Sequence, residues 1–257
     1  MSDALYLAAR DEVAGLHAGD TFTLAGEEGR HAATVKRTRV GEAVLVADGA
    51  GRGVRVMVTS VASGALTGDV VEVVDEPASP WRWQVVQGLA KGDRADLSVE
   101  ILTEVGVDLV AAWQSRRSIV KWDAKADKAL AKWRATAREA AKQSRRLQVP
   151  AVHPVLVTPK NLTSTLTEFG GLVLVAHEAA TARLEDVVLP ASGPVTVLVG
   201  PEGGIADDEL DELVILGAQP VLIADQVLRA STAGAVALVQ LQLMARQQYP
   251  DQGAAHG

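Results

Sequence analysis

The sequence contains no cysteine, which excludes disulfide bonds, thiolate metal sites and cysteine nucleophiles. Aromatic residues make up only 4% of its 257 residues, so aliphatic side chains must build the core. No apolar run reaches the roughly 18 residues that a membrane-spanning helix needs, and the N-terminus shows no secretory pattern. We therefore expect a folded cytoplasmic protein of one large or two modest domains, without membrane partner or metal.

Charge is unevenly distributed along the chain, whose formal net charge is −7. Residues 1–80 hold seven basic and twelve acidic groups, residues 81–150 hold fourteen and eight, and residues 151–257 hold four and twelve. Because salt screens charges beyond about 8–10 Å, the basic segment could hold a phosphate backbone although the whole chain is negative. A solvated helix face explains the same segment equally well.

The first 76 residues have the pattern of short strands separated by turn residues. Strands at about 8–12-residue spacing suggest a small β-barrel. The prolines and acids of residues 75–80 then predict a linker. The expected strands are 20–24, 32–38, 43–47, 53–61 and 70–74.

After the linker, predicted strands alternate with predicted helices. Such alternation implies an α/β domain with a mostly parallel sheet that is covered on both faces. The expected strands are 83–89, 108–113, 152–157, 172–176, 195–199 and 220–224, and the expected helices are 95–105, 124–147, 207–216 and 232–247.

The helix predicted over 124–147 is amphipathic and ends in a basic cluster. Two adjacent arginines beside an amide and a hydroxyl suit phosphate binding at Gln143-Ser144-Arg145-Arg146. The predicted packing stripe is Leu130, Trp133, Ala137, Ala140, Ser144 and Leu147.

A glycine-rich loop, Gly200-Pro201-Glu202-Gly203-Gly204, follows the strand predicted over 195–199. In an open α/β sheet, ligands bind beyond the carboxyl ends of strands, where glycine lets the backbone approach closely. The loop matches neither phosphate-binding glycine motif. Three acids at 207–209 favour a ligand that is positively charged or read through backbone amides. A tight connection without a ligand remains the alternative.

Two further loops are expected at the same edge of the sheet. In the loop 224–233, Ser231 or Thr232 can cap the last helix, and Arg229 is one of only four basic residues after position 150. Such an arginine suits a phosphate or a partner carboxylate. The third loop carries His177 and Glu178; adjacent residues seldom form a working acid–base pair, so His177 is expected to be a loop residue rather than a catalyst.

Five motifs follow one another along the chain: KGDR at 91–94, EVGVD at 104–108, AAKQSRR at 140–146, GPEGG at 200–204 and VLRASTA at 227–233. In this order they resemble the motifs of RsmE-type 16S ribosomal RNA uridine-N3 methyltransferases, a family of the SPOUT superfamily. The chain departs from the family's common residues at Ser231, where glutamate is usual, and at Gln226, Val105 and Ala112. Ser231 therefore leaves the place of a catalytic carboxylate open.

The resemblance implies an N-terminal, RNA-binding PUA-like β-barrel over 1–76 and a SPOUT methyltransferase domain over 77–257. In that domain 81–150 would be basic and RNA-facing, and 170–250 would form a trefoil knot that binds the cofactor. It also implies a homodimer that methylates N3 of a uridine in 16S rRNA of the small ribosomal subunit with S-adenosylmethionine (SAM). By the same resemblance, SAM would contact Val175, His177, Leu198, Gly200, Glu202, Gly203, Ile223, Leu228 and Ala233.

Chemistry narrows the reaction further. Methylation at C5 of a pyrimidine ordinarily needs a cysteine nucleophile, which this chain lacks. Attack by a nitrogen or a ribose oxygen remains, and Arg229 could stabilise the anion that forms at a deprotonated uridine or bind a phosphate. The residues expected to bind RNA are Arg10, Arg30, Lys36, Arg37, Arg39, Lys91, Arg94, Arg138, Gln143, Arg145 and Arg146.

Three alternatives stay open. A related SPOUT enzyme could methylate a ribose 2′-oxygen or a tRNA guanine. A protein of the same fold could serve as a non-catalytic ribosome-assembly factor that binds RNA. A nucleotide-binding metabolic enzyme is disfavoured because the usual phosphate-binding motifs are missing.

Overall fold

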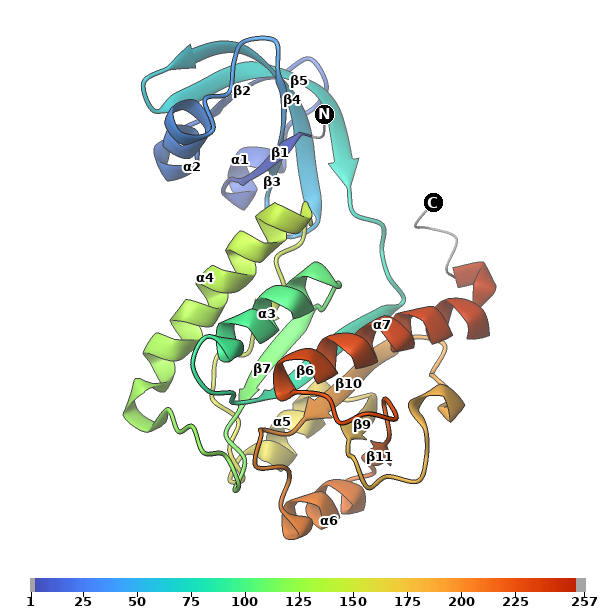
Figure 1. Cartoon of the computed structure of the whole chain (residues 1–257). Helices are drawn as coiled ribbons and strands as arrows, with labels where there is room; N and C mark the ends of the chain where they lie inside the picture. Colours follow the sequence, from blue (N-terminus) through green and yellow to red (C-terminus); the bar gives the residue numbers. More distant parts are fainter. Residues whose placement is uncertain (1–2, 253–257) are drawn as a thin grey trace. The chain divides into compact units, whose positions relative to one another are not determined.

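The computed structural model describes residues 3–252 and divides the chain into two compact units. The first unit consists of Met1–Pro77 together with Ala141–Val149, and the second consists of Ala78–Ala140 together with Pro150–Gly257. Figure 1 shows the helices and strands of both.

The first unit is built on a five-stranded sheet with the order β1-β3-β4-β5-β2. β1 pairs parallel with β3, and the other pairs are antiparallel. Alternation along β4 buries Val54, Val56 and Val58 in the core and leaves Arg55 exposed. The elements are β1 (Ala4–Leu7), α1 (Arg10–Val13), β2 (Thr21–Leu24), α2 (Gly26–Arg30), β3 (Ala43–Ala47), β4 (Arg52–Ala62) and β5 (Ala65–Asp75).

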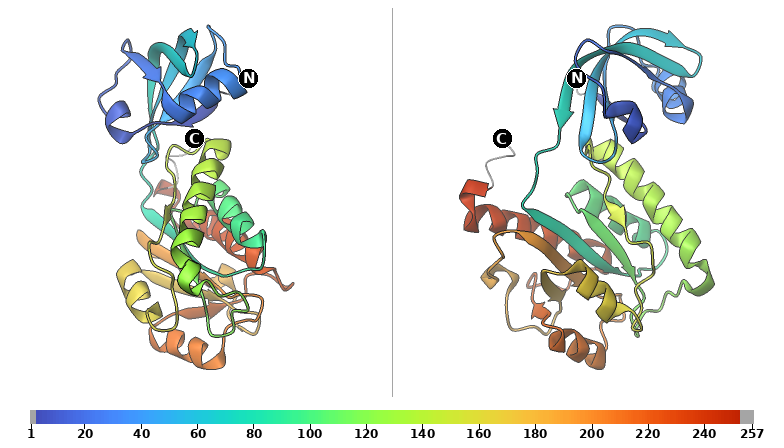
Figure 2. Two further views of the ribbon diagram at one scale, coloured as in Figure 1. Left: turned by 90° about the vertical axis from the view of Figure 1, so that its left-hand side faces the viewer. Right: turned by 180° about the vertical axis from the view of Figure 1, so that it is seen from behind.

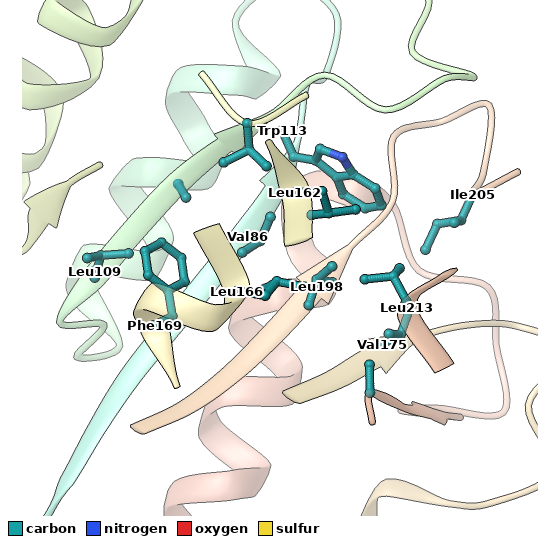
Figure 3. Close-up of a cluster of buried hydrophobic side chains, with 13 residues drawn as sticks. Val86, Leu109, Trp113, Leu162, Leu166, Phe169, Val175, Leu198, Ile205 and Leu213 are labelled. Atoms are coloured by element: carbon teal, nitrogen blue, oxygen red, sulfur yellow. The ribbon is translucent and has the colours of Figure 1, made fainter. Parts of the chain in front are cut away.

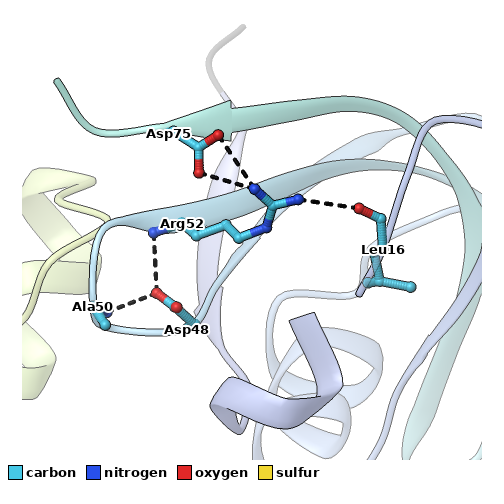
Figure 4. Close-up of polar contacts among 5 residues, drawn as sticks. All are labelled: Leu16, Asp48, Ala50, Arg52 and Asp75. Atoms are coloured by element: carbon cyan, nitrogen blue, oxygen red, sulfur yellow. Dashed lines mark hydrogen bonds and ion pairs between the residues drawn. The ribbon is translucent and has the colours of Figure 1, made fainter. Parts of the chain in front are cut away.

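An arginine-centred network fixes the turn between β3 and β4 (Figure 4). Asp48 Oδ1 accepts hydrogen bonds from the backbone N–H groups of Ala50 (2.7 Å) and Arg52 (3.0 Å). The Arg52 side chain then donates to Asp75 Oδ1 at 3.1 Å and to the Leu16 carbonyl at 3.3 Å. The Asp48–Gly49 turn expected from the sequence is thus tied to the neighbouring strand β5.

The strand predicted over 32–38 is wrong. Residues His31–Val35 form a π-helical turn, in which the N–H of Lys36 donates to the carbonyl of His31 at 2.9 Å. Ala32 is buried while Val35 is 64% exposed, so its apolar side chain does not mark a buried strand face. A helical turn of five residues is too short for the hydrophobic period of a helix to show in the sequence.

The segment Ala141–Val149 packs with the first unit, although the sequence pattern groups it with 81–150. Leu147 joins a cluster with Leu5, Leu7 and Ala47. Lys142 Nζ lies 3.0 Å from Glu28 Oε1, and both side chains are less than 15% exposed. Helix α4 (Ala126–Ser144) therefore begins in the second unit and ends in the first.

The second unit contains a six-stranded, wholly parallel sheet with the order β11-β9-β10-β6-β7-β8. The prediction of a parallel sheet is confirmed. The outer strands are shorter than expected, since 152–157 contributes only the end of β8 and 220–224 only part of β11. The strands are β6 (Trp81–Gly88), β7 (Leu109–Trp113), β8 (Ala151–Val152), β9 (Leu172–Ala176), β10 (Gly193–Val199) and β11 (Gln219–Val221).

Helices cover both faces of this sheet, as the alternating pattern predicts (Figure 2). Helices α3 (Arg94–Glu104) and α7 (Ala230–Gln248) pack against each other, and α7 also packs on β6 and β10. On the other face, α5 (Leu162–Phe169) and α6 (Asp207–Ile215) bury Leu166, Phe169 and Leu213 against the strands (Figure 3). The sequence pattern does not predict α5, whose eight residues span just two turns.

Candidate functional site

Four strands of the second unit end at the same level. Val199 is opposite Ala176 on one side and Gln87 on the other, and Ala176 is opposite Val221. The N–H of His177 donates to the carbonyl of Val221 at 3.0 Å, so the loops after β9 and β11 leave the sheet side by side. The three predicted ligand loops therefore start together at the carboxyl edge, where ligands of parallel sheets bind.

The glycine-rich loop after β10 packs closely against neighbours on both sides. A Cβ atom on Gly88, at the end of β6, would lie 2.4 Å from the backbone nitrogen of Pro201. A Cβ atom on Gly203 would lie 2.4 Å from the carbonyl oxygen of Arg117. Gly204 has a φ of +75° and donates its N–H to the carbonyl of Pro201. Only glycine fits these approaches, so the backbone of the loop packs directly against the end of β6 and the Arg117 carbonyl.

Glu202 lies exposed in this loop and is partly engaged with the protein itself. Its Oε1 accepts a 3.3 Å hydrogen bond from the backbone N–H of Lys91, in the turn after β6. The carboxylate thereby ties the predicted 200–204 loop to the 91–94 turn, so its first role in this structure is to hold two loops together.

The loop after β11 lies along the segment between β9 and β10. The N–H of Leu222 donates to the carbonyl of Ala182 at 2.8 Å, and the N–H of Leu184 donates back to Leu222 at 3.0 Å. Arg183 Nη1 also donates to Asp225 at 2.9 Å. Ile223 is held by α7, because Gln240 Nε2 donates to its carbonyl at 2.9 Å.

Helix α7 begins at the site. Its N-cap residue is Arg229, whose carbonyl accepts hydrogen bonds from Thr232 and Ala233 (both 2.9 Å) while its side chain is exposed. The expected cap by Ser231 or Thr232 is wrong, because the Thr232 hydroxyl donates to Arg229 and Ser231 is buried in the first turn. Gln87, almost fully buried, donates to the carbonyl of Ala230 at 3.1 Å and so anchors the helix start to β6.

The residues predicted to contact the cofactor fall into two groups. Val175 and Leu198 are fully buried and pack in the core with Ile205 and Leu213, so only their backbone could face a ligand (Figure 3). Ala233 is buried in α7. The others lie in the loops at the carboxyl edge, half-buried or exposed: His177, Gly200, Glu202, Gly203, Ile223 and Leu228.

The residues predicted to bind RNA lie on the surface, and they are divided between the two units. All are exposed except Arg146, which is half-buried. Lys91, Arg94 and Arg138 belong to the second unit. The first unit carries Arg10, Arg30, Lys36, Arg37, Arg39, Gln143, Arg145 and Arg146.

The acids after the glycine-rich loop have arginine partners within the chain. Arg116 lies 2.9 Å from Asp208 and 2.7 Å from Glu212, and Arg117 lies 3.3 Å from Asp207. The sequence patterns did not identify either arginine as a partner, because they are 90–96 residues away from the acids along the chain. Opposite charges at 116–117 and 207–212 are the only signal that could have found them.

Burial raises the pKa of Glu209 above the ordinary value of 4.5. Hydrogen bonds from the backbone N–H groups of Arg116 and Ala206 oppose this rise but are outweighed by desolvation.

Over residues 3–252, no group of three or more His, Asp or Glu side chains is placed to hold a metal ion, and no helix has the length and apolarity to cross a membrane.

The sequence that forms most of the second unit is similar to that of known RNA methyltransferases. The family model for the RNA methyltransferase domain matches residues 77–242. The chain is 44% identical over 223 residues to ribosomal RNA small subunit methyltransferase E of Mycobacterium bovis, covering 86% of this chain and 85% of that protein. The protein of the same name from Bacillus subtilis is 29% identical over 226 residues, covering 85% and 88%.

A solved structure is similar over almost the whole chain. It is ribosomal RNA small subunit methyltransferase E from Neisseria gonorrhoeae bound to S-adenosyl methionine, with a TM-score of 0.82 and 25% identity. The match covers 95% of this chain and 98% of that chain. The protein described here therefore belongs to the RNA methyltransferase family.

Proposed function

We propose that this protein transfers the methyl group of SAM to N3 of a uridine in the 16S rRNA of the small ribosomal subunit. The observation that carries the proposal is the set of loops after β9, β10 and β11, which start together at the carboxyl edge. Relatives with 44% and 29% identity are named as small subunit rRNA methyltransferases, and the similar solved structure binds SAM.

The residues at this edge fit SAM. The glycines of the 200–204 loop keep side chains away from one side, as the close approaches of Gly88 and Gly203 require. The half-buried side chains of Ile223 and Leu228 offer apolar contact for an adenine ring. SAM supplies the methyl group when it is bound, and the loops hold and orient it.

Arg229 is our candidate for the group that assists the acceptor. Loss of the N3 proton leaves negative charge on O2 and O4 of uracil, which a guanidinium can stabilise. The Arg229 side chain is exposed at the start of α7, while its carbonyl fixes the first turn of that helix. Ser231 is buried and has no carboxylate, so it cannot accept the proton as a glutamate could.

The first unit is proposed to bind RNA as a PUA-like barrel. Its five-stranded sheet packs over a buried core that includes Tyr6, Phe22 and Val46. The exposed residues Lys36, Arg37 and Arg39 follow directly on its π-helical turn. Phosphate contacts from such residues would position the RNA without reading its sequence.

We also infer a knotted C-terminal region and a homodimer. Residues around Leu222 lie against the 182–184 segment, and α7 returns to the same long connection through Gln248 Nε2, which donates to Val187. This arrangement suits a chain threaded through that connection. Val239 and Leu243, on α7, are about half exposed, an apolar surface that suits a second copy. Light scattering of the purified protein tests the dimer.

Methyl transfer to small ribosomal subunits that lack the modification tests the proposed function. With labelled SAM, we expect label in 3-methyluridine after digestion of the 16S rRNA, identified by mass spectrometry. Label in a 2′-O-methylated nucleoside, or in a tRNA guanine, would replace the proposal with a related RNA methyltransferase. SAM binding without any transfer would favour a non-catalytic assembly factor.

A further inference from the structure

The carboxylate of Glu209 joins two segments of the second unit that are far apart in the sequence. Glu209 is fully buried in the first turn of α6. Its Oε2 accepts the N–H of Ala206 at 3.4 Å, and its Oε1 accepts the N–H of Arg116 at 3.0 Å. Burying a carboxylate is unfavourable even when it is hydrogen-bonded. Capping of α6 by itself is therefore a weak explanation for a buried glutamate at position 209.

Charged side chains surround this link and strengthen it. Arg116 pairs with Asp208 and Glu212 on the exposed side of α6. Arg117 donates to the carbonyl of Ile205 at 3.1 Å and to Asp207 at 3.3 Å. The segment after β7 is therefore fastened to α6 through both its backbone and its side chains.

The fastened segment sets the shape of the glycine-rich loop. The carbonyl oxygen of Arg117 occupies the space that a Cβ atom on Gly203 would need. At the other end of the loop, the side chain of Ile205 lies 2.9 Å from the corresponding position on Gly200. Because Arg117 also holds the Ile205 carbonyl, a shift of residues 116–117 would move the loop backbone.

We propose that Glu209 is a positioning residue for the SAM site, acting through Arg116 and Arg117 on the 200–204 loop. The inference rests on the proposed function, since it assigns SAM to that loop. A loop held in its binding shape before SAM arrives has less conformational entropy to lose on binding. Weakening the link should therefore reduce affinity for SAM more than it reduces the rate at saturating SAM.

The test compares Glu209→Gln with the control Asp211→Asn. Gln keeps the size of Glu209 but accepts only one of the two N–H groups and turns its own NH₂ towards the other. Asp211 is an exposed residue of the same helix and is not among the acids that pair with Arg116 or Arg117. We expect Glu209→Gln to raise the Kd for SAM, measured by calorimetry, about tenfold and to speed hydrogen exchange in residues 200–205 without SAM. The KM for SAM should rise while kcat stays within about twofold, and Asp211→Asn should change none of these.

An unchanged Kd in a folded Glu209→Gln protein, or an equal loss in both variants, would overturn the inference. If Glu209→Gln does not fold, the exposed Arg117→Ala variant decides: a Kd about threefold higher supports the inference, and an unchanged Kd refutes it. Absence of SAM binding to the unaltered protein would refute the proposed function instead. Hydrogen exchange without SAM would still show whether Glu209 holds the loop.

Discussion

The backbone N–H of Arg146 donates a 2.9 Å hydrogen bond to the carbonyl of Ala141 and closes the last turn of α4. Between these two residues, Arg145 donates its backbone N–H to the carbonyl of Lys142 and has a φ of +58°. These two bonds form the Schellman motif, whose left-handed position usually holds glycine. An arginine in this conformation is strained, and we predict that its side chain has a role besides ending the helix.

Replacing Arg145 by glycine should separate stability from RNA binding. Glycine adopts the left-handed conformation without strain, and exposed charges contribute little to stability, so Arg145→Gly should raise the free energy of unfolding by about 0.5–1 kcal/mol. If Arg145 contacts a phosphate, the slope of log affinity against log salt should flatten by about one for 16S rRNA. Urea denaturation and binding titrations measure both.

Arg134→Ala is the control for Arg145→Gly, because Arg134 is an exposed arginine of the same helix outside the predicted RNA-binding set. For Arg134→Ala, the slope of log affinity for 16S rRNA against log salt should stay unchanged. A normal slope in Arg145→Gly would assign Arg145 to the general surface.

Gly203→Ala should weaken SAM binding at least tenfold. The new Cβ would collide with the Arg117 carbonyl, so the loop must move away from its place. Gly193→Ala is the control: it adds strain at a φ of +102° at the start of β10, but its Cβ meets nothing within 4 Å. Calorimetry with SAM compares the two, and equal affinities would show that the loop backbone does not bind SAM.

The stability of the protein should fall with rising pH through the titration of Glu209. The pKa of Glu209 is raised in the folded state, so the folded protein binds more protons than the unfolded chain between pH 4.5 and that higher pKa. The stability that protonated Glu209 contributes is therefore lost as the pH rises through this window. Urea denaturation from pH 4 to pH 8 should show the unaltered protein losing stability relative to Glu209→Gln as pH rises; a constant difference would contradict the shift.

Arg229→Ala should lower kcat with little effect on stability. Its carbonyl still caps α7, so only the exposed guanidinium is lost. Loss of one group that stabilises a developing anion costs about 10²-fold in kcat. Single-turnover methyl transfer measures this step, with Arg246→Ala, at the other end of α7, as the control. A changed KM for RNA at normal kcat would make Arg229 a phosphate contact instead.

Local patterns identified the strands and helices that carry the site. Hydrophobic runs bounded by glycine, such as the one before Gly200, predict β9 and β10 because short runs of β-branched residues between turn residues are typical of buried parallel strands. The π-helical turn at His31–Val35 and the short helix α5 escaped prediction, since both are too short for a helical period to show.

The parallel sheet, its glycine-rich loop and the arginine at the start of the last helix could be predicted from the sequence, because each depends on residues that are adjacent in the chain. The partners of the acids at 207–212 and the packing of the basic end of α4 could be seen in the folded structure alone. Those partners, Arg116 and Arg117 for the acids and the cluster around Leu147 for α4, come together through folding. Ion pairing and burial depend on which residues lie close together in the folded chain, and a local sequence pattern does not contain that information.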